Sequence, residues 1–159
     1  AERMLDLGIR FGKALQMINI LRDIPSDLSI GRCYIPKDRL SEYGLSPSDL
    51  LNPDSMGSFR ALYSAYLDLT CEHLDYAEEY ISIIPRKYRS LRLSCLLPVV
   101  IGRRTIALLR DKNVLNPGKP IKIGRRSIGL ILFQCKLAVR SEWYEKRLIS
   151  SGRIFSTGE

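Results

Sequence analysis

The feature that most constrains the fold is a long segment, residues 55–84, whose apolar side chains recur at helical spacing. Intervals of three and four residues place these side chains on one face of an α-helix. The same spacing predicts helices over residues 2–24, over 86–111 with a bend at Pro98, and over 124–148. No segment alternates as a strand does, so the sequence predicts an all-α fold with one domain.

Shorter elements connect these helices. Pro25 and Gly31 are expected to bracket a loop, "KDRLSEYG" to form a short helix, and "SPSDLL" to begin another that Ser46 or Ser48 caps. We expect residues 1–148 to form the helical domain and residues 149–159 to form a polar tail.

The charge of the chain favours an anionic partner. There are 25 lysines and arginines against 17 aspartates and glutamates, a formal net charge of +8. Nucleic acid, an anionic membrane surface and a phosphorylated small molecule all fit this balance, and so does a simple solubility surface. Nucleic acid is disfavoured, because the arginines are scattered over the helices instead of forming one stripe with aromatic residues.

The cysteine content and the lengths of the apolar runs argue against a zinc site and against a membrane-spanning segment. The four cysteines form no C-x-x-C pair and there is one histidine, which argues against a zinc site. They are expected to be reduced and mostly buried. The longest apolar runs are too short to span a bilayer, which leaves peripheral membrane contact open.

A line of polar residues crosses the first predicted helix, in "LQMINILRDIPSD". Gln16, Asn19, Asp23 and Asp27 follow spacings of three, four and four, so they share one side of a helix that reaches residue 27. Most other positions of this helix are apolar, which predicts that it is surrounded by protein. The polar line should then face a partner group, a water-filled cavity or a ligand, because unpaired carboxylates are costly in a protein interior.

Two interpretations of this line remain open. Two carboxylates one turn apart with an amide beside them suit Mg²⁺, which takes few protein carboxylates and keeps waters and substrate phosphates. Arg22, Arg32 and Lys37 are near in sequence and would hold a phosphate. Alternatively, the line is a helix end with solvated aspartates, and Pro25 favours this by ending the helix before Asp27.

Other candidate groups have plainer explanations. A second acidic line on the 55–84 helix lies opposite its apolar face and is interpreted as solvated: Asp68, Glu72, Asp75 and Glu79. Tyr63, Tyr66 and Tyr80 lie on the inward face, as core aromatics or as faces for a cationic intermediate. His73 is interpreted as a satisfied core histidine.

The run "GKALQMINILRDIPSDLSIGRCYIPKDRL" resembles the second aspartate-rich segment of the squalene and phytoene synthases. The shared pattern is Q-x-x-N-I-x-R-D-x-x-x-D followed by G-R-x-Y-x-P. The downstream runs "LYSAYLDLTCEHLDYAEEYISIIP" and "RLSCLLPVVIGRRTIALLR" are similar to later helices of that family. The resemblance covers nearly the whole chain, as the family's C-terminal half, and looks nearest to bacterial squalene-synthase-like members.

The resemblance implies a terpenoid-synthase helical fold and a role for each matching residue. Asn19, Asp23 and Asp27 would bind Mg²⁺, or Mn²⁺ in its place, with both aspartates catalytic. Gln16 and Arg22 would contact the substrate diphosphate or the cavity wall. Arg32 and Tyr34 would belong to a flap that touches phosphate, although a structural salt bridge is an equal alternative for Arg32. Further basic residues sit where the family tends to place them, either near phosphate or on a solvated face: Lys119, Lys122, Arg125 and Arg126.

The implied reaction is a Mg²⁺-dependent head-to-head condensation of two prenyl diphosphates, farnesyl or geranylgeranyl, to a squalene- or phytoene-type product. NADPH would serve as reductant if squalene is formed. The implied location is cytoplasmic, with peripheral contact at the inner membrane face as a further option.

The family's first aspartate-rich helix lies upstream of the second, and this chain has no other D-x-x-x-D. We therefore expect a C-terminal piece or a truncated homologue that is inactive alone and self-associates through its uncovered apolar face. The alternative is a non-catalytic relative that acts in binding or assembly, whose expected signature is loss of the aspartates.

Overall fold

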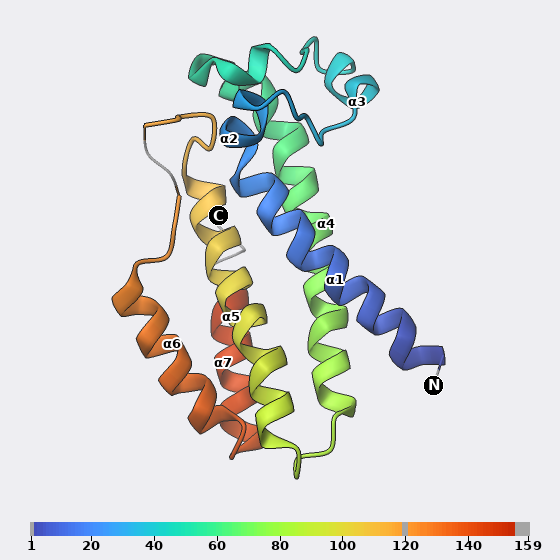
Figure 1. The fold of residues 1–159 in the computed structure, drawn as a ribbon, viewed down its shortest axis with the longest axis vertical. Helices are drawn as coiled ribbons and strands as arrows, with labels where there is room; N and C mark the ends of the chain where they lie inside the picture. The colour runs from blue at the N-terminus through green and yellow to red at the C-terminus, as the bar shows by residue number, and fades with distance from the viewer. Residues whose placement is uncertain (1, 119–120, 155–159) are drawn as a thin grey trace.

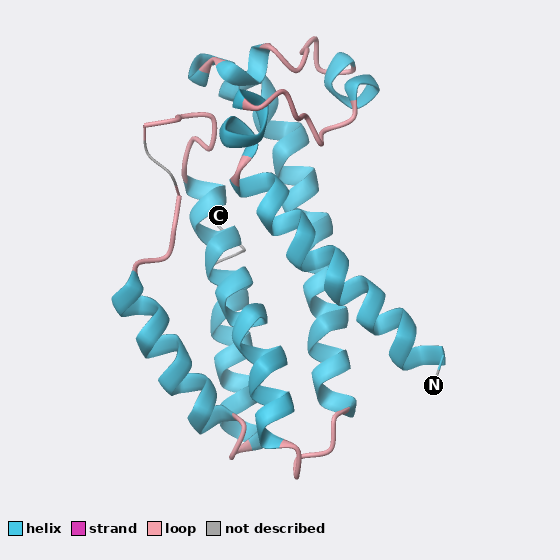
Figure 2. Ribbon diagram, viewed as in Figure 1, coloured by secondary structure: helices cyan, strands magenta, loops and turns pink. Residues whose placement is uncertain are grey.

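The computed structural model describes residues 2–118 and 121–154, and within these ranges the chain is helical with no strand (Figure 2). The all-α prediction is confirmed. The elements follow in this order: α1 (Glu2–Arg22), α2 (Ile24–Ser29), α3 (Lys37–Ser41), the 3₁₀ helices η1 (Asp49–Leu51) and η2 (Pro53–Ser55), α4 (Met56–Ile83), α5 (Arg89–Asp111), α6 (Arg125–Ala138) and α7 (Glu142–Ile154).

The long helices α4 and α5 lie side by side in the middle of the molecule, joined by a short turn (Figure 1). α1 packs along α4 on one flank and also contacts α5. α6 and α7 pack against each other and against α5 on the other flank. The short helices gather beside the N-terminal end of α4, where α1 ends, so the end of α1 lies close to several loops.

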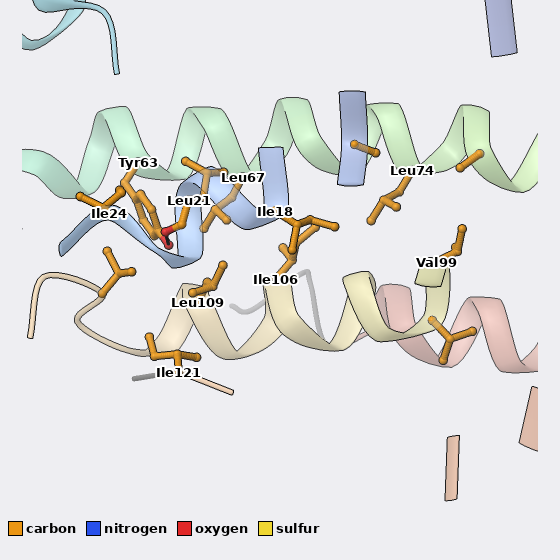
Figure 3. Packing of buried hydrophobic residues seen from close by; sticks show 14 of the residues in the cluster. Ile18, Leu21, Ile24, Tyr63, Leu67, Leu74, Val99, Ile106, Leu109 and Ile121 are labelled. Carbon is orange, nitrogen blue, oxygen red and sulfur yellow. Dashed lines mark hydrogen bonds between the residues drawn. The ribbon is translucent and has the colours of Figure 1, made fainter. Parts of the chain in front are cut away.

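The core between α1, α4 and α5 consists of interlocking aliphatic side chains (Figure 3). Ile18 and Leu21 of α1 meet Leu67 of α4 and Ile106 of α5, and all four are at most 5% exposed. Burying one such side chain contributes about 1.5–3 kcal/mol. This packing fixes the C-terminal half of α1, which carries the polar line.

α1 approaches α5 closely at Gly102. A Cβ atom placed on Gly102 would lie 2.7 Å from the Cδ1 atom of Ile18, closer than packed carbon atoms come. Glycine in a helix normally costs about 0.5–1 kcal/mol relative to alanine. Its place in the middle of α5 is explained by this contact, which brings α1 close to α5 one turn before Arg22.

Buried arginines tie the helices together. Arg92 of α5 is 2% exposed and donates hydrogen bonds to the carbonyl oxygens of Ile81 (2.6 Å) and Ile84 (2.5 Å) at the end of α4. It also pairs with Glu145 of α7 at 2.5 Å. Arg92 thus caps α4, whose last carbonyls have no helical partner, and binds α7 to the same point.

Two more arginines of α5 reach the acidic line on α4. Arg103 binds Asp75 at 2.5 Å and Glu78 at 2.6 Å, and Arg110 binds Asp68 at 2.5 Å. The exposed line that the sequence predicted to be merely solvated therefore also carries ion pairs. The arginines are scattered along the sequence because each one binds a different acidic side chain.

Several helix boundaries differ from the predictions. The loop expected from Pro25 onward is wrong for its first part, because Ile24–Ser29 forms α2, and correct for residues 30–36. Pro25 occupies the first turn of α2, where its N–H group is not needed for a hydrogen bond within α2. At "SPSDLL" the capping is reversed: the carboxylate of Asp49 accepts hydrogen bonds from the backbone N–H (2.7 Å) and the hydroxyl (2.6 Å) of Ser46.

The single helix predicted over 124–148 is two helices, α6 and α7, separated at residues 139–141. The Ser141 Oγ atom accepts a hydrogen bond from the Tyr144 N–H group at 3.4 Å, as a helix-capping serine does. α7 continues to Ile154, beyond residue 148, and residues 155–159 of the predicted tail lie outside the described residues.

The cysteines and the hydropathy of the helices bear on two further expectations. All four cysteines are free, but only Cys135 is buried, while Cys33, Cys71 and Cys95 are half-buried. Among the helices of the described ranges, none combines the length and the hydropathy needed to cross a membrane.

Candidate functional site

Two backbone hydrogen bonds carry the polar line across the junction of α1 and α2, where Asp23 itself is not helical. The Asp23 N–H group donates to the carbonyl oxygen of Asn19, and the Asp27 N–H group donates to the carbonyl oxygen of Asp23, each at 2.9 Å. These are helical i to i−4 bonds. Asn19, Asp23 and Asp27 therefore occupy successive turns, although α1 ends at Arg22.

Tyr63 of α4 supports this junction at Pro25. The carbonyl oxygen of Leu21 would normally accept a bond from residue 25, but proline has no N–H group. The hydroxyl of Tyr63 donates to this oxygen instead, at 3.0 Å, and points toward Leu21 in Figure 3. Burial raises the pKa of the Tyr63 phenol, which keeps it protonated as a donor.

The prediction that α1 is surrounded by protein is wrong for the described residues. α1 buries only Leu7, Ala14, Ile18 and Leu21. Gln16 and Asn19 are exposed, and Leu5 and Ile9 on the same side are 66% and 51% exposed. The polar line thus lies on an open face of α1, and only its C-terminal end, at Asp23 and Asp27, is half-buried.

A hollow with a volume of about 340 Å³ lies between the α1–α2 junction and the loop before α6. Of the polar line, which was predicted to face a cavity, a partner group or a ligand, only Asp23 lines this hollow. Arg22 holds the Asp23 carboxylate with two bonds, from Nε at 2.9 Å and from the terminal nitrogen at 2.5 Å. This contact raises the pKa of Arg22, mainly through the hydrogen bond to Asp23.

Lys122 lines the same hollow, although it is distant in sequence. It comes from the segment between α5 and α6, together with Asn116 and Ile121. Of the other basic residues singled out with it, Arg125 and Arg126 are exposed in the first turn of α6, and Lys119 lies outside the described residues. The hollow therefore combines one carboxylate with two cations, Arg22 and Lys122, a charge pattern suited to an anionic ligand with a divalent cation.

Asp27 lies in a different small crevice. Arg32, Tyr34 and several apolar side chains line it, and the Arg32 N–H group donates to the Asp27 carbonyl oxygen at 2.9 Å. The Arg32 and Tyr34 side chains are exposed. The structure thus groups Asp23 with Arg22 and Lys122, and Asp27 with Arg32 and Tyr34, while Gln16 and Asn19 lie on the preceding turns.

The polar line offers too few ligands to enclose a metal ion by itself, and it suits an ion that water and a substrate also bind. No group of three or more His, Cys, Asp or Glu side chains gathers as a metal site within the described residues. Asn19, Asp23 and Asp27 offer two carboxylates and one amide on consecutive turns. Mg²⁺ accepts so few protein ligands because water and substrate phosphates complete its octahedron.

The aromatic residues of α4 include contacts with α1. The Tyr80 ring lies 5.9 Å from the Phe11 ring, centre to centre, and Tyr63 is fully buried.

Half-buried His73 has no hydrogen-bond partner for its buried Nδ1 atom among the described residues, so it is not the satisfied core histidine that was expected. Burial and the nearby cations Lys13 and Arg10 lower its pKa.

Comparison with known protein families shows to which family the chain belongs. The family model for squalene/phytoene synthase matches residues 1–126, which include the polar line, the loop with Arg32 and Tyr34, and the Lys122 segment. The chain belongs to the squalene/phytoene synthase family. The resemblance carried by "QMINILRD" and "GRCYIP" is thereby confirmed, and the all-α architecture agrees with the family's terpenoid-synthase fold.

Three relatives illustrate the similarity. Presqualene diphosphate synthase of Rhodopseudomonas palustris is 27% identical over 133 residues, 82% of this chain and 46% of that protein. The enzyme of the same name from Sinorhizobium fredii is 31% identical over 139 residues, 86% of this chain and 48% of that protein. A bifunctional lycopene cyclase/phytoene synthase of Phaeosphaeria nodorum is 32% identical over 128 residues, 80% of this chain and 20% of that protein. The chain spans about half the length of the two synthases.

Proposed function

We propose that the chain supplies one metal- and diphosphate-binding wall of a prenyltransferase that joins two prenyl diphosphates head to head. The observation that carries this proposal is the hollow in which Asp23 lies with Arg22 and Lys122, one turn after Asn19 and one turn before Asp27. Family membership supports the reaction class. The names of the relatives support a presqualene diphosphate or phytoene type of product.

Each residue has a role in this proposal. Asn19, Asp23 and Asp27 would hold Mg²⁺, or Mn²⁺ in its place, and the bound cation would neutralise charge that develops on the departing diphosphate. Arg22 and Lys122 would bind diphosphate oxygens from two sides of the hollow. Gln16 extends the polar line, and Arg32 and Tyr34 would close over the phosphate from the loop after α2.

The ion pair between Arg22 and Asp23 has a specific place in this scheme. With the carboxylate engaged by Arg22 in two bonds, both groups are oriented toward the hollow and neither carries an uncompensated charge. Arrival of a diphosphate with its cation would exchange this pair for two new ones, Asp23 to metal and Arg22 to phosphate. Opposite charges are then matched before and after binding.

The chain by itself is expected to bind diphosphate weakly and not to turn it over. Ionisation depends on charges arranged around the whole leaving group, and loss of one such contact typically costs about 10²–10³ in rate. The two synthases compared with the chain are about twice its length. Retention of both aspartates favours this enzymatic role over the non-catalytic alternative. A reductant such as NADPH would enter only for a squalene product.

The decisive experiment is calorimetric titration of the chain with a non-hydrolysable farnesyl diphosphate analogue, with and without Mg²⁺. Asp23→Asn should lower the Mg²⁺-dependent affinity by about tenfold or more, because charged hydrogen-bonding and metal contacts at one group are worth about 1.5–3 kcal/mol. Asp6→Asn is the matched control, since Asp6 is an exposed carboxylate on the same helix and pairs with Arg10. Equal affinities for the wild type and Asp23→Asn would place the site elsewhere.

A product assay completes the test. Prenyl diphosphate turnover should be absent for the chain alone and appear only with the remaining part of a family synthase supplied in trans. Turnover by the chain alone that survives Asp23→Asn would overturn the proposed site.

A further inference from the structure

The outer face of α6 carries an apolar stripe that no described element covers. α6 lies on the flank of the bundle, with Ile131, Cys135 and Ala138 buried toward its neighbours (Figure 1). On its other side Leu130, Phe133 and Leu137 are 64%, 61% and 40% exposed. Their spacing of three and four residues aligns them along the helix. Three large apolar side chains in a row on an exposed helix indicate a contact surface.

The sequence segment that contains this stripe carries charge of one sign, although Asp111 and Glu142 flank it directly. From Lys112 to Ser141 the sequence contains seven lysines and arginines and no aspartate or glutamate. In the described part of this segment Lys136 lies beside the stripe and Arg140 follows the end of α6, and both are exposed. Many arginines elsewhere are neutralised in ion pairs, as Arg92, Arg103 and Arg110 are.

The open face of α1 is a comparison within the same chain, because it exposes apolar side chains that are not accompanied by cations alone. Leu5 and Ile9 are as exposed as the residues on α6, but Glu2 and Asp6 lie on the same helix. α1 therefore presents mixed charge with its apolar residues. α6 presents apolar residues with cations only, which is the composition of helices that lie in the interface of anionic membranes.

We propose that α6 docks flat on an anionic lipid bilayer. Leu130, Phe133 and Leu137 would enter the boundary between headgroups and acyl chains, and Lys136 and Arg140 would bind the phosphates of acidic lipids. Trp143, the only tryptophan, follows α6 closely and is 67% exposed with the Arg147 guanidinium over its ring. An exposed tryptophan next to such a helix suits the headgroup layer. This surface is separate from the proposed catalytic hollow.

The test is co-sedimentation of the full chain with vesicles of phosphatidylcholine, alone or mixed with phosphatidylglycerol. The wild type should bind the phosphatidylglycerol vesicles and bind phosphatidylcholine alone much more weakly. The variant L130Q/F133Q should reduce the partition coefficient by about tenfold or more, because two exposed apolar side chains no longer enter the bilayer. The variant K136Q/R140Q should reduce it by about 30-fold on anionic vesicles, at about 1 kcal/mol for each cation.

The matched control is L5Q/I9Q, which removes two equally exposed apolar residues from α1 and should leave vesicle binding unchanged. All the substituted side chains are exposed, and circular dichroism verifies that the helices are intact. Failure of the wild type to bind anionic vesicles, equal binding by L130Q/F133Q, or equal loss with L5Q/I9Q would each overturn the proposal. A change of oligomeric state in L130Q/F133Q, without vesicle binding by the wild type, would identify a second copy of the chain as the occupant instead.

Discussion

The Tyr63 hydroxyl donates its hydrogen bond to the Leu21 carbonyl oxygen at 3.0 Å and so takes the place of the N–H group that Pro25 lacks. A residue on α4 thereby stabilises the end of α1, one residue before Arg22. The polar line depends on this contact because Asn19, Asp23 and Asp27 occupy successive turns only while α2 follows α1 in this orientation.

Replacing Tyr63 by phenylalanine should lower the free energy of unfolding by about 1–2 kcal/mol, since the buried Leu21 carbonyl loses its partner while the aromatic packing is kept. Urea denaturation measures this. Tyr76→Phe is the control, because Tyr76 lies on the same helix and its side chain is exposed. If both variants unfold at the same urea concentration, the Tyr63 hydroxyl has no such role.

Replacing Gly102 by alanine should destabilise the chain by about 1–3 kcal/mol, the usual cost of overpacking, because the new methyl group would meet Ile18 at 2.7 Å. Gly129→Ala on α6 has open space around it and should instead stabilise the chain by about 0.5–1 kcal/mol through helix propensity. Thermal unfolding of the two variants compares the effects. Stabilisation by Gly102→Ala would show that α1 and α5 are not in close contact there.

Replacing Arg92 by alanine should cost about 3–5 kcal/mol, because Glu145 is left as an unpaired buried charge. Two carbonyl oxygens at the end of α4 would also lose their donor. The exposed pair between Arg39 and Glu42 is the comparison, and Arg39→Ala should cost less than about 1 kcal/mol. Similar losses in the two variants, measured by chemical denaturation, would contradict the buried pairing.

Stability should fall as the pH drops below about 6.5 because of His73. Its folded pKa is lowered from the ordinary value of 6.5, first by burial and then by Lys13 and Arg10, against a smaller opposing effect of Glu72. The unfolded chain therefore takes up the proton first, and acidification favours unfolding. His73→Gln should flatten the dependence of the urea midpoint between about pH 7 and pH 5.5, since no other histidine is present. An unchanged slope in this variant would assign the effect to other groups.

The long helices could be predicted from sequence because apolar periodicity reports burial on one face. Residues 55–84 were predicted and Met56–Ile83 was found. The environment of α1 could not be predicted in the same way. Its apolar residues indicate which surfaces avoid water, but not whether another part of a protein covers them, and here Leu5 and Ile9 are open.

In the candidate site, too, the local features were predictable from sequence and the long-range contacts were not. The spacing of Asn19, Asp23 and Asp27 is local, and the successive turns that it predicts are found, although Asp23 and Asp27 line different hollows. Pro25 was interpreted as the end of the helix because proline lacks a donor, and the compensating donor, Tyr63, lies 42 residues away. Lys122 likewise reaches the hollow only through the folded chain. Local spacing carries no signal of such pairings.

The link between Arg92 and Glu145 also determines when the fold can be completed during synthesis. The two residues are separated by 53 positions, so Arg92 leaves the ribosome well before its partner is made. Until α7 is synthesised, the α4–α5 hairpin must keep this guanidinium hydrated, and water will compete for the end of α4. A nascent chain that pauses before residue 145 should therefore keep this end of the bundle open to chaperones, and the arrival of α7 should close it.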